Sequence, residues 1–283
     1  MKKIAIILFA IVTQANAQNS LEFNKLQVEC INKWVAYPIN KDKTYSYGYI
    51  YFDNTAGLTL NFEGYFKKDD NKNFYIVKDT VKNKPAFLKV RLQPNKTLVA
   101  ELPDSIISNL GLEKVPEWLK IYREGENTTT ALYNKGYCYN AWGFYDKAIE
   151  NLLKAYQSDK NYKGLRTELA FSYNALKKYD EAVKILLEEL KVAPDNQYTY
   201  KELAFAYNNL KKFDEVLKVY KKMVKINKNH DYILETAHNI AYEYFLLKDK
   251  DNFNFWKSEA NKWGSPNDRY ISNINLMDKE LNK

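Results

Sequence analysis

The sequence has little of what catalytic and metal centres are usually built from. Its 283 residues include only two cysteines and two histidines, and no pair stands at the spacing of metal ligands. It contains no glycine-rich phosphate loop and no nucleophile motif with a histidine base. We therefore expect a binding protein and not an enzyme, with no metal and no cofactor. A hydrolase that uses two carboxylates has no short sequence signature. A hydrolase in the region before the helical repeats, residues 18–128, therefore stays open as a third hypothesis.

Long apolar runs are also scarce, and the one at the N-terminus is short. Two lysines precede the uncharged run 4–12, and Ala15 and Ala17 supply small residues where signal peptidase reads the chain. The run is too short for a permanent membrane anchor. We therefore expect a cleavable signal in residues 1–17, a periplasmic or secreted mature chain, and no transmembrane segment in it. Gln18 stands where a lipoprotein needs cysteine, so we expect no lipid anchor.

Positive charge is present but not concentrated. The formal net charge is +8, and lysines alternate with acidic residues almost everywhere. Even the densest lysine cluster, from Lys211 to Lys228, is interrupted by Asp214 and Glu215. A nucleic-acid-binding surface would gather basic residues and aromatic rings on one face. We therefore expect solvated helix faces and no nucleic-acid partner.

A period of 34 residues runs through the second half of the sequence. In each window a small residue is followed three positions later by a tyrosine, then by an aromatic–aspartate pair and a second small or branched residue. The matching positions are Gly136, Ala170 and Ala204; Tyr139, Tyr173 and Tyr207; Tyr145, Tyr179 and Phe213; and Ala148, Ala182 and Val216. This pattern resembles the tetratricopeptide repeat, with windows 129–162, 163–196 and 197–230, and a degenerate fourth at 234–267.

The resemblance implies a mainly α fold, a right-handed superhelix of helical hairpins. One hairpin alone leaves an apolar face exposed, so stacking must bury the core. Residues 268–283 carry apolar side chains at helical spacing, which predicts a capping helix. The whole layout also resembles exported bacterial tetratricopeptide proteins with a short tyrosine-rich leading domain. That resemblance implies no particular activity.

Residues 18–128 differ in kind from the repeats. Residues 45–52 and 57–66 alternate in the manner of strands and are joined by turn residues, and shorter strand-like runs follow. We expect a small antiparallel sheet, with short helices after Pro103 and Pro116. The stretch 21–35 is ambiguous between strand and helix.

The resemblance also implies where a partner would bind, because the first helix of each hairpin lines the concave surface in this family. The groove would present an aromatic row beside a ladder of asparagines. Carboxamides can pair with a peptide backbone, and aromatic rings can form apolar pockets. Alternatively, the asparagines are simply solvated and the rings pack against neighbouring helices. The predicted groove residues are Tyr133, Tyr137, Asn140, Thr167, Phe171, Asn174, Lys201, Phe205, Asn208, His238 and Tyr242.

We therefore expect an exported scaffold or adaptor that binds an extended peptide or protein partner, within a cell-envelope assembly. Lys201 alone is not the basic cluster by which some relatives hold a terminal carboxylate. The alternative is a glycan- or peptidoglycan-binding module that uses the leading domain. There, period two places four rings on one strand face, although packing is the favoured interpretation of such a row. These rings are Tyr45, Tyr47, Tyr49 and Tyr51.

The two cysteines of the mature chain, Cys30 and Cys138, are candidates for a disulfide because an exported protein meets oxidising conditions. Closing a loop of this length could add about 4 kcal/mol in the chain-entropy model. The alternative for Cys138 is a packing role, because the equivalent positions in the next windows hold Ser172 and Ala206.

Overall fold

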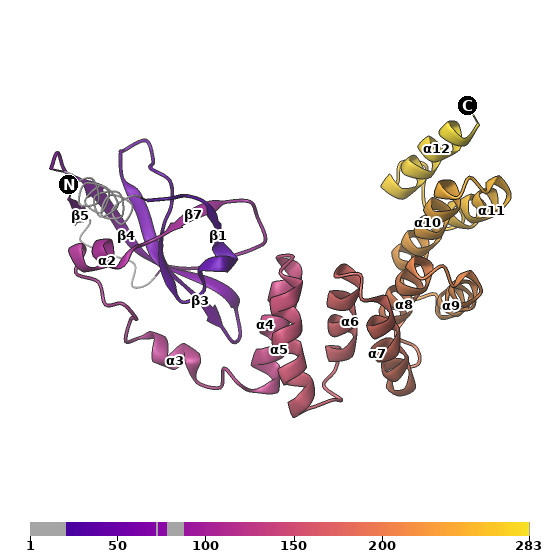
Figure 1. The fold of residues 1–283 in the computed structure, drawn as a ribbon, viewed down its shortest axis with the longest axis horizontal. Helices are drawn as coiled ribbons and strands as arrows, with labels where there is room; N and C mark the ends of the chain where they lie inside the picture. The colour runs from indigo at the N-terminus through magenta and orange to yellow at the C-terminus, as the bar shows by residue number, and fades with distance from the viewer. Residues whose placement is uncertain (1–20, 72, 78–87, 283) are drawn as a thin grey trace, which may run out of the picture. The chain divides into compact units, whose positions relative to one another are not determined.

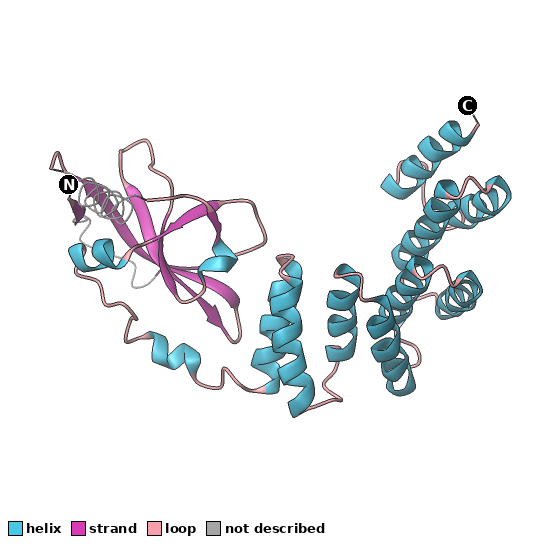
Figure 2. Ribbon diagram, viewed as in Figure 1, coloured by secondary structure: helices cyan, strands magenta, loops and turns pink. Residues whose placement is uncertain are grey.

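The computed structural model describes residues 21–71, 73–77 and 88–282, so the predicted signal segment 1–17 lies outside the described part. The chain divides into two compact units, residues 1–143 and 144–283. Among the described residues, the strands all belong to the first unit, and the second unit is helical (Figures 1 and 2). This is the predicted fold class, a mainly α chain of helical hairpins preceded by an antiparallel sheet.

The first unit is built around the hairpin of β3 (Tyr45–Asp53) and β4 (Gly57–Lys68). Its turn is held by Asp53, whose Oδ1 accepts the backbone N–H groups of Thr55 and Ala56, both at 2.8 Å. This side-chain turn is typical of aspartate. Gly57 follows with a φ of 82°, a left-handed conformation that glycine adopts without a steric penalty.

The remaining strands are short and extend the sheet on both sides of this hairpin. The strand order is β1-β7-β2-β3-β4-β5, with β6 also paired to β4, and every pairing is antiparallel. The ambiguous stretch 21–35 contains both predicted kinds of structure, two strands around a 3-10 helix. The 3-10 helix is η1 (Gln27–Cys30). The short strands of the sheet are β1 (Lys25–Leu26), β2 (Lys33–Ala36), β5 (Phe74–Ile76), β6 (Leu88–Arg91) and β7 (Leu98–Glu101).

Two short helices, α2 (Asp104–Asn109) and α3 (Leu119–Arg123), contribute to the core on one face of this sheet. Tyr47, Tyr49 and Tyr51 are at most 3% exposed on that face. The ring of Trp34 lies 5.2 Å from Tyr49, and that of Trp118 lies 5.3 Å from Tyr51.

The fourth tyrosine of the row, Tyr45, is half-buried and stacks on Phe66 at 5.1 Å. The row therefore belongs to the core, as the favoured interpretation held. The alternative ligand face is wrong, because rings covered by Trp34 and Trp118 cannot stack on a sugar.

The first unit ends with α4 (Thr129–Ala141), which opens the first repeat window. This helix packs on β4, and the side-chain amide of Asn134 donates to the backbone oxygen of Asn54 at 3.0 Å. Thr128 caps the helix by accepting the Ala131 N–H. The division between the units thus falls inside the first repeat window and not at residue 128.

The second unit consists of consecutive helices that follow the predicted windows. Within it, neighbouring helices pack as hairpins, and the first helices α6, α8 and α10 also lie side by side. The last helix, α12, packs on α10 and α11 through three buried side chains, as expected of a cap. The helices are α5 (Tyr145–Ser158), α6 (Leu165–Ala175), α7 (Tyr179–Val192), α8 (Gln197–Asn209), α9 (Phe213–Ile226), α10 (His230–Leu246), α11 (Lys250–Asn261) and α12 (Arg269–Leu281).

The turns inside these hairpins repeat one backbone geometry. Lys177, Lys211 and Lys248 each follow a first helix with a φ between 56° and 60°. The next residue donates its N–H back into that helix, as Lys212 does to the Tyr207 oxygen at 2.9 Å. This is the closing pattern of a helix that ends in a left-handed residue. It reverses the chain in a few residues, so the second helix packs directly on the first.

Small side chains allow that close packing. Ala170, Ala182, Ala204 and Val216 are all at most 2% exposed in one continuous core that runs to α12. These are the positions that define the 34-residue period, so the repeated small residues lie where helices pack against each other. The hairpins are therefore rigid enough to hold side chains in fixed places along their first helices.

Candidate functional site

A hollow of about 210 Å³ lies in the second unit, where α6, α8 and α10 run side by side. It is smaller than the roughly 300–1,000 Å³ of typical small-molecule pockets. A single side chain of a partner suits this volume better than a bulky cofactor does. Five of the predicted groove residues line it, namely Phe171, Asn174, Lys201, Phe205 and Asn208.

The two phenylalanines combine packing with exposure. Phe171 lies edge-on to Tyr145 at 6.1 Å, and Phe205 lies in the same way against Tyr179 at 6.3 Å. In each case an aromatic ring at the start of the second helix of one hairpin supports a ring on the first helix of the next hairpin. Phe205 nevertheless stays 36% exposed. The rings are therefore held in place on one side and available to a partner on the other.

The asparagines tie consecutive hairpins together. The Nδ2 of Asn174 donates to the backbone oxygen and to Oε2 of Glu202, both at 3.0 Å. The Nδ2 of Asn208 donates to the backbone oxygen of Asn239 at 3.1 Å. Both side chains are buried, so the interpretation that they are merely solvated is wrong. Their Oδ1 atoms are buried too and have no hydrogen-bond partner, although both residues line the hollow.

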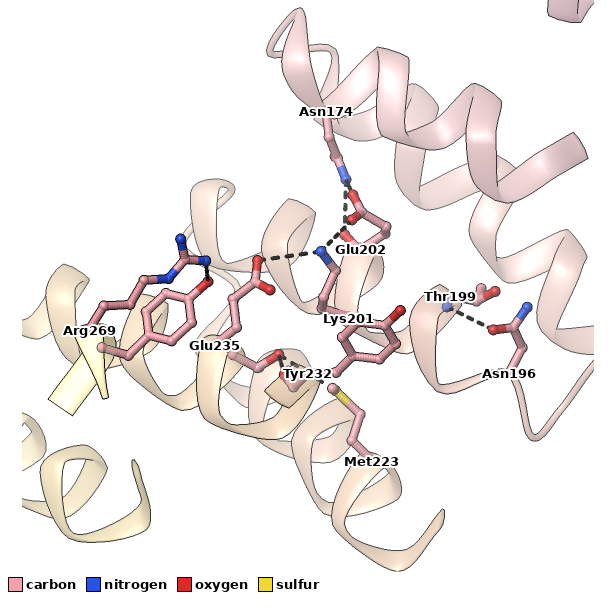
Figure 3. Close-up of polar contacts among 11 residues, drawn as sticks. Asn174, Asn196, Thr199, Lys201, Glu202, Met223, Tyr232, Glu235 and Arg269 are labelled. Atoms are coloured by element: carbon pink, nitrogen blue, oxygen red, sulfur yellow. Dashed lines mark hydrogen bonds and ion pairs between the residues drawn. The ribbon is translucent and has the colours of Figure 1, made fainter. Parts of the chain in front are cut away.

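Lys201 lies between two carboxylates at the wall of the hollow. Its Nζ is 3.0 Å from Oε1 of Glu202 and 3.4 Å from Oε1 of Glu235 (Figure 3). The rings of Tyr198 and Tyr232 lie 5.1 Å and 5.7 Å from the same ammonium. These contacts hold the lysine from several sides, so its charge is matched within the protein.

Burial alone would lower the pKa of Lys201, but the charges and hydrogen bonds of Glu202 and Glu235 outweigh it, and the pKa is raised above 10.5. The lysine is therefore charged at neutral pH. One ammonium and two carboxylates leave this wall with one net negative charge.

Glu202 and Glu235 were not among the groove residues predicted from the sequence. A signal was present, since Lys201 and Glu235 carry opposite charges and stand one 34-residue period apart. Stacking of repeats brings such residues together. Charge complementarity at the repeat period could therefore have found the pair.

Three predicted groove residues of the second unit do not line the hollow. Thr167 is buried, and its hydroxyl pairs with that of Thr199 at 3.0 Å between α6 and α8. His238 contacts Oδ1 of Asn239 at 3.0 Å through Nδ1. Tyr242 is exposed and stacks on Phe245 at 6.3 Å. Thr167 therefore connects α6 with α8, whereas this contact of His238 lies within α10.

The other predicted groove residues, Tyr133, Tyr137 and Asn140, lie on α4 in the first unit. Asn140 is buried there, and Tyr137 is exposed. Tyr137 lines a separate hollow in that unit with the turn before β4 and the end of β6. The structure thus brings together the candidates from α6 and α8.

Both cysteines are free thiols in the structure, so the candidate disulfide between them is not formed. Cys30 is fully buried, and burial raises the pKa of its thiol to about 11. Burial also raises the pKa of Cys138, which hydrogen-bonds the backbone at Leu58. Both groups are therefore thiols and not thiolates at neutral pH, which suits the packing role.

Two other features are absent from the described residues. No three histidine, cysteine, aspartate or glutamate side chains within the described ranges gather as metal ligands would. None of the described helices combines the length and apolar character needed to cross a membrane.

Comparison with known proteins supports the repeat family. Residues 129–162 match the model of the tetratricopeptide repeat, and none of the curated proteins compared with the chain matches it. Similar solved structures include MamA of strain AMB-1, with 22% identity over 51% of this chain and 84% of its own and a TM-score of 0.42.

Two further structures have comparable similarity. The pilF protein of Pseudomonas aeruginosa has 17% identity over 58% of this chain and 72% of its own, with a TM-score of 0.45. The first TPR domain of human RPAP3 has 24% identity over 42% of this chain and 97% of its own, with a TM-score of 0.37. The support for the family therefore rests on the model match and on the regular hairpins.

Proposed function

We propose that this chain is an exported scaffold that binds an extended peptide or protein segment in the groove formed by α6, α8 and α10. Tetratricopeptide hairpins are typical of protein–protein interaction modules. The observation that carries the proposal is the hollow where exposed phenylalanine lies beside unpaired carboxamide oxygens. An extended peptide can place alternate side chains against the rings while its backbone runs past the asparagines. The role requires neither a cofactor nor a catalytic group.

The proposal is tested by comparing capture by matched variants. Envelope extract of the source organism is passed over the mature protein (residues 18–283), over its Phe205→Ser variant and over a Phe255→Ser variant. Phe255→Ser is the matched control, because Phe255 is a half-exposed phenylalanine on α11 that does not line the hollow. We expect the wild type and the Phe255 variant to retain the same protein and the Phe205 variant to lose it. Equal retention by all three would argue against this groove.

Export is the second part of the proposal and is tested separately. A cleaved signal gives a periplasmic or secreted protein whose mass corresponds to a chain beginning at Gln18. Replacing both Ala15 and Ala17 by leucine should block cleavage, because signal peptidase accepts only small residues there. A chain recovered from the cytoplasm with all 283 residues would contradict export.

A further inference from the structure

The charged groups around the hollow do not suit an anion. Lys201 is the cation among the residues that line it, and both of its carboxylate partners line it as well. An incoming carboxylate would have to displace Glu202 or Glu235 from Lys201 and would meet the negative charge that remains. A cation meets the opposite situation, because two carboxylates face one ammonium at short range.

The uncharged polar groups at the same place are acceptors. Asn174 and Asn208 are 4% and 3% exposed, and their Oδ1 atoms have no hydrogen-bond partner. Their N–H groups are used on neighbouring backbone oxygens and on Glu202. Each unpaired oxygen adds its partial negative charge to that of the carboxylates, which disfavours an anion in the hollow and favours a cation.

Glu235 supplies the accessible charge. Its side chain is 29% exposed, against 5% for Glu202, and the contact with Lys201 uses its Oε1 atom. The apolar part of the hollow comes from Phe171 and Phe205. An aromatic face attracts a cation, and it also packs well against a methylene chain. The ligand group defined by these features has an apolar stem and a cationic end that donates hydrogen bonds.

We propose that the hollow binds one lysine or arginine side chain of the extended segment held in the groove. The inference rests on the proposed function, since it names the residue that such a segment must carry. The cationic end lies against Glu235, and the stem lies against Phe205. A volume of about 210 Å³ suits one such side chain.

The test uses synthetic peptides, so it does not depend on the natural partner. Four capped peptides of alternating alanine and serine carry arginine, lysine, leucine or glutamate at the centre. Their affinities for the mature protein are measured by titration calorimetry. We expect arginine and lysine to bind about ten- to hundredfold more tightly than leucine, the range for a hydrogen bond to a charged group, and glutamate to bind most weakly. Added salt should reduce this preference.

A matched pair of variants assigns the preference to the hollow. Glu235→Gln should remove most of the preference for arginine over leucine. Glu243→Gln is the control, since Glu243 also lies on α10 and pairs with a lysine, Lys211, but does not line the hollow. It should leave the preference unchanged.

The outcomes separate the two proposals. Equal affinity for arginine, lysine and leucine overturns the cation site but leaves the groove as a binding site. Tightest binding of the glutamate peptide also overturns the cation site and leaves the groove. A preference that survives Glu235→Gln places the cation elsewhere and overturns the inference too. If none of the four peptides binds, the proposed function fails together with the cation site.

Discussion

Asn208 gives the sharpest prediction about how the array is held together. Its Nδ2 donates to the Asn239 oxygen at 3.1 Å from a side chain that is 3% exposed. Asn208→Ala removes this hydrogen bond, which contributes about 0.5–1.5 kcal/mol, and leaves a cavity in place of the buried carboxamide, while the Asn239 oxygen keeps its bond within α10. The higher helix propensity of alanine returns about 0.6 kcal/mol, and the unpaired Oδ1 disappears as well. We therefore expect the free energy of unfolding to fall by about 1–2 kcal/mol.

Asn208→Asp keeps the shape of the side chain but replaces the donor by a carboxylate oxygen. That oxygen faces the Asn239 carbonyl in a buried position, so at neutral pH we expect a loss of more than about 3 kcal/mol. Burial favours the protonated carboxyl, which can donate its proton to the same carbonyl. The folded state then binds a proton that the unfolded state releases, so stability returns in acid and is lost as the pH rises.

Urea denaturation followed by circular dichroism measures both effects. Asn209→Ala is the control, because Asn209 is the next residue and donates only to Phe205 within its own helix. We expect that variant to stay within about 0.5 kcal/mol of the wild type. The reasoning is refuted if the Asn208 variants lose no more stability than this control. It is also refuted if the aspartate variant matches the alanine variant at neutral pH.

Other predictions follow from buried charges, buried hydroxyls and close backbone contact. Glu189→Leu leaves the buried Arg166 guanidinium without its partner at 3.2 Å and should cost about 3–5 kcal/mol, whereas adding Arg166→Met should recover much of this loss in urea denaturation. Burial raises the pKa of Tyr47 and Tyr51 from 10 to about 12, so their neutral hydroxyls stabilise the first unit up to about pH 10. Stability should then fall between about pH 10 and 12, and the tyrosinate absorbance of these two residues, measured as the difference from a Tyr47→Phe, Tyr51→Phe double variant, should rise together with unfolding. Gly48→Ala would place a methyl carbon 2.3 Å from a backbone oxygen of β4, so we expect the near-ultraviolet circular dichroism of the sheet to be lost.

The helices of the second half could be predicted from the sequence because the residues that repeat are those that pack between helices. Ala170 and Ala204 recur one period apart since each is buried where helices approach closely. The last helix was equally predictable, because Ile271 and Ile274 show which of its faces must be covered. In these elements the local pattern and the packed structure carry the same information.

The candidate site was only partly predictable, because window position does not determine exposure. Thr167 and Lys201 occupy equivalent positions, yet Thr167 is buried against Thr199 while Lys201 reaches two carboxylates at the hollow. Which partner a side chain meets depends on the neighbouring repeat, whose residues differ from window to window.

The tyrosine row shows the same limit in the first unit. Period two correctly places Tyr47, Tyr49 and Tyr51 on one face, but nothing within that strand says whether the face is covered. The cover comes from Trp34 on a neighbouring strand and from Trp118, which is distant in the sequence.

The most direct test of the groove is site-specific photo-crosslinking in the source organism. A photoreactive phenylalanine analogue replaces Phe205 in the hollow or, as the control, Lys222, which is exposed on α9 outside it. We expect the analogue at 205 to join one discrete protein, and mass spectrometry of the joined peptide to find an extended segment containing lysine or arginine. No product at 205, or the same products from both positions, would contradict binding in this groove.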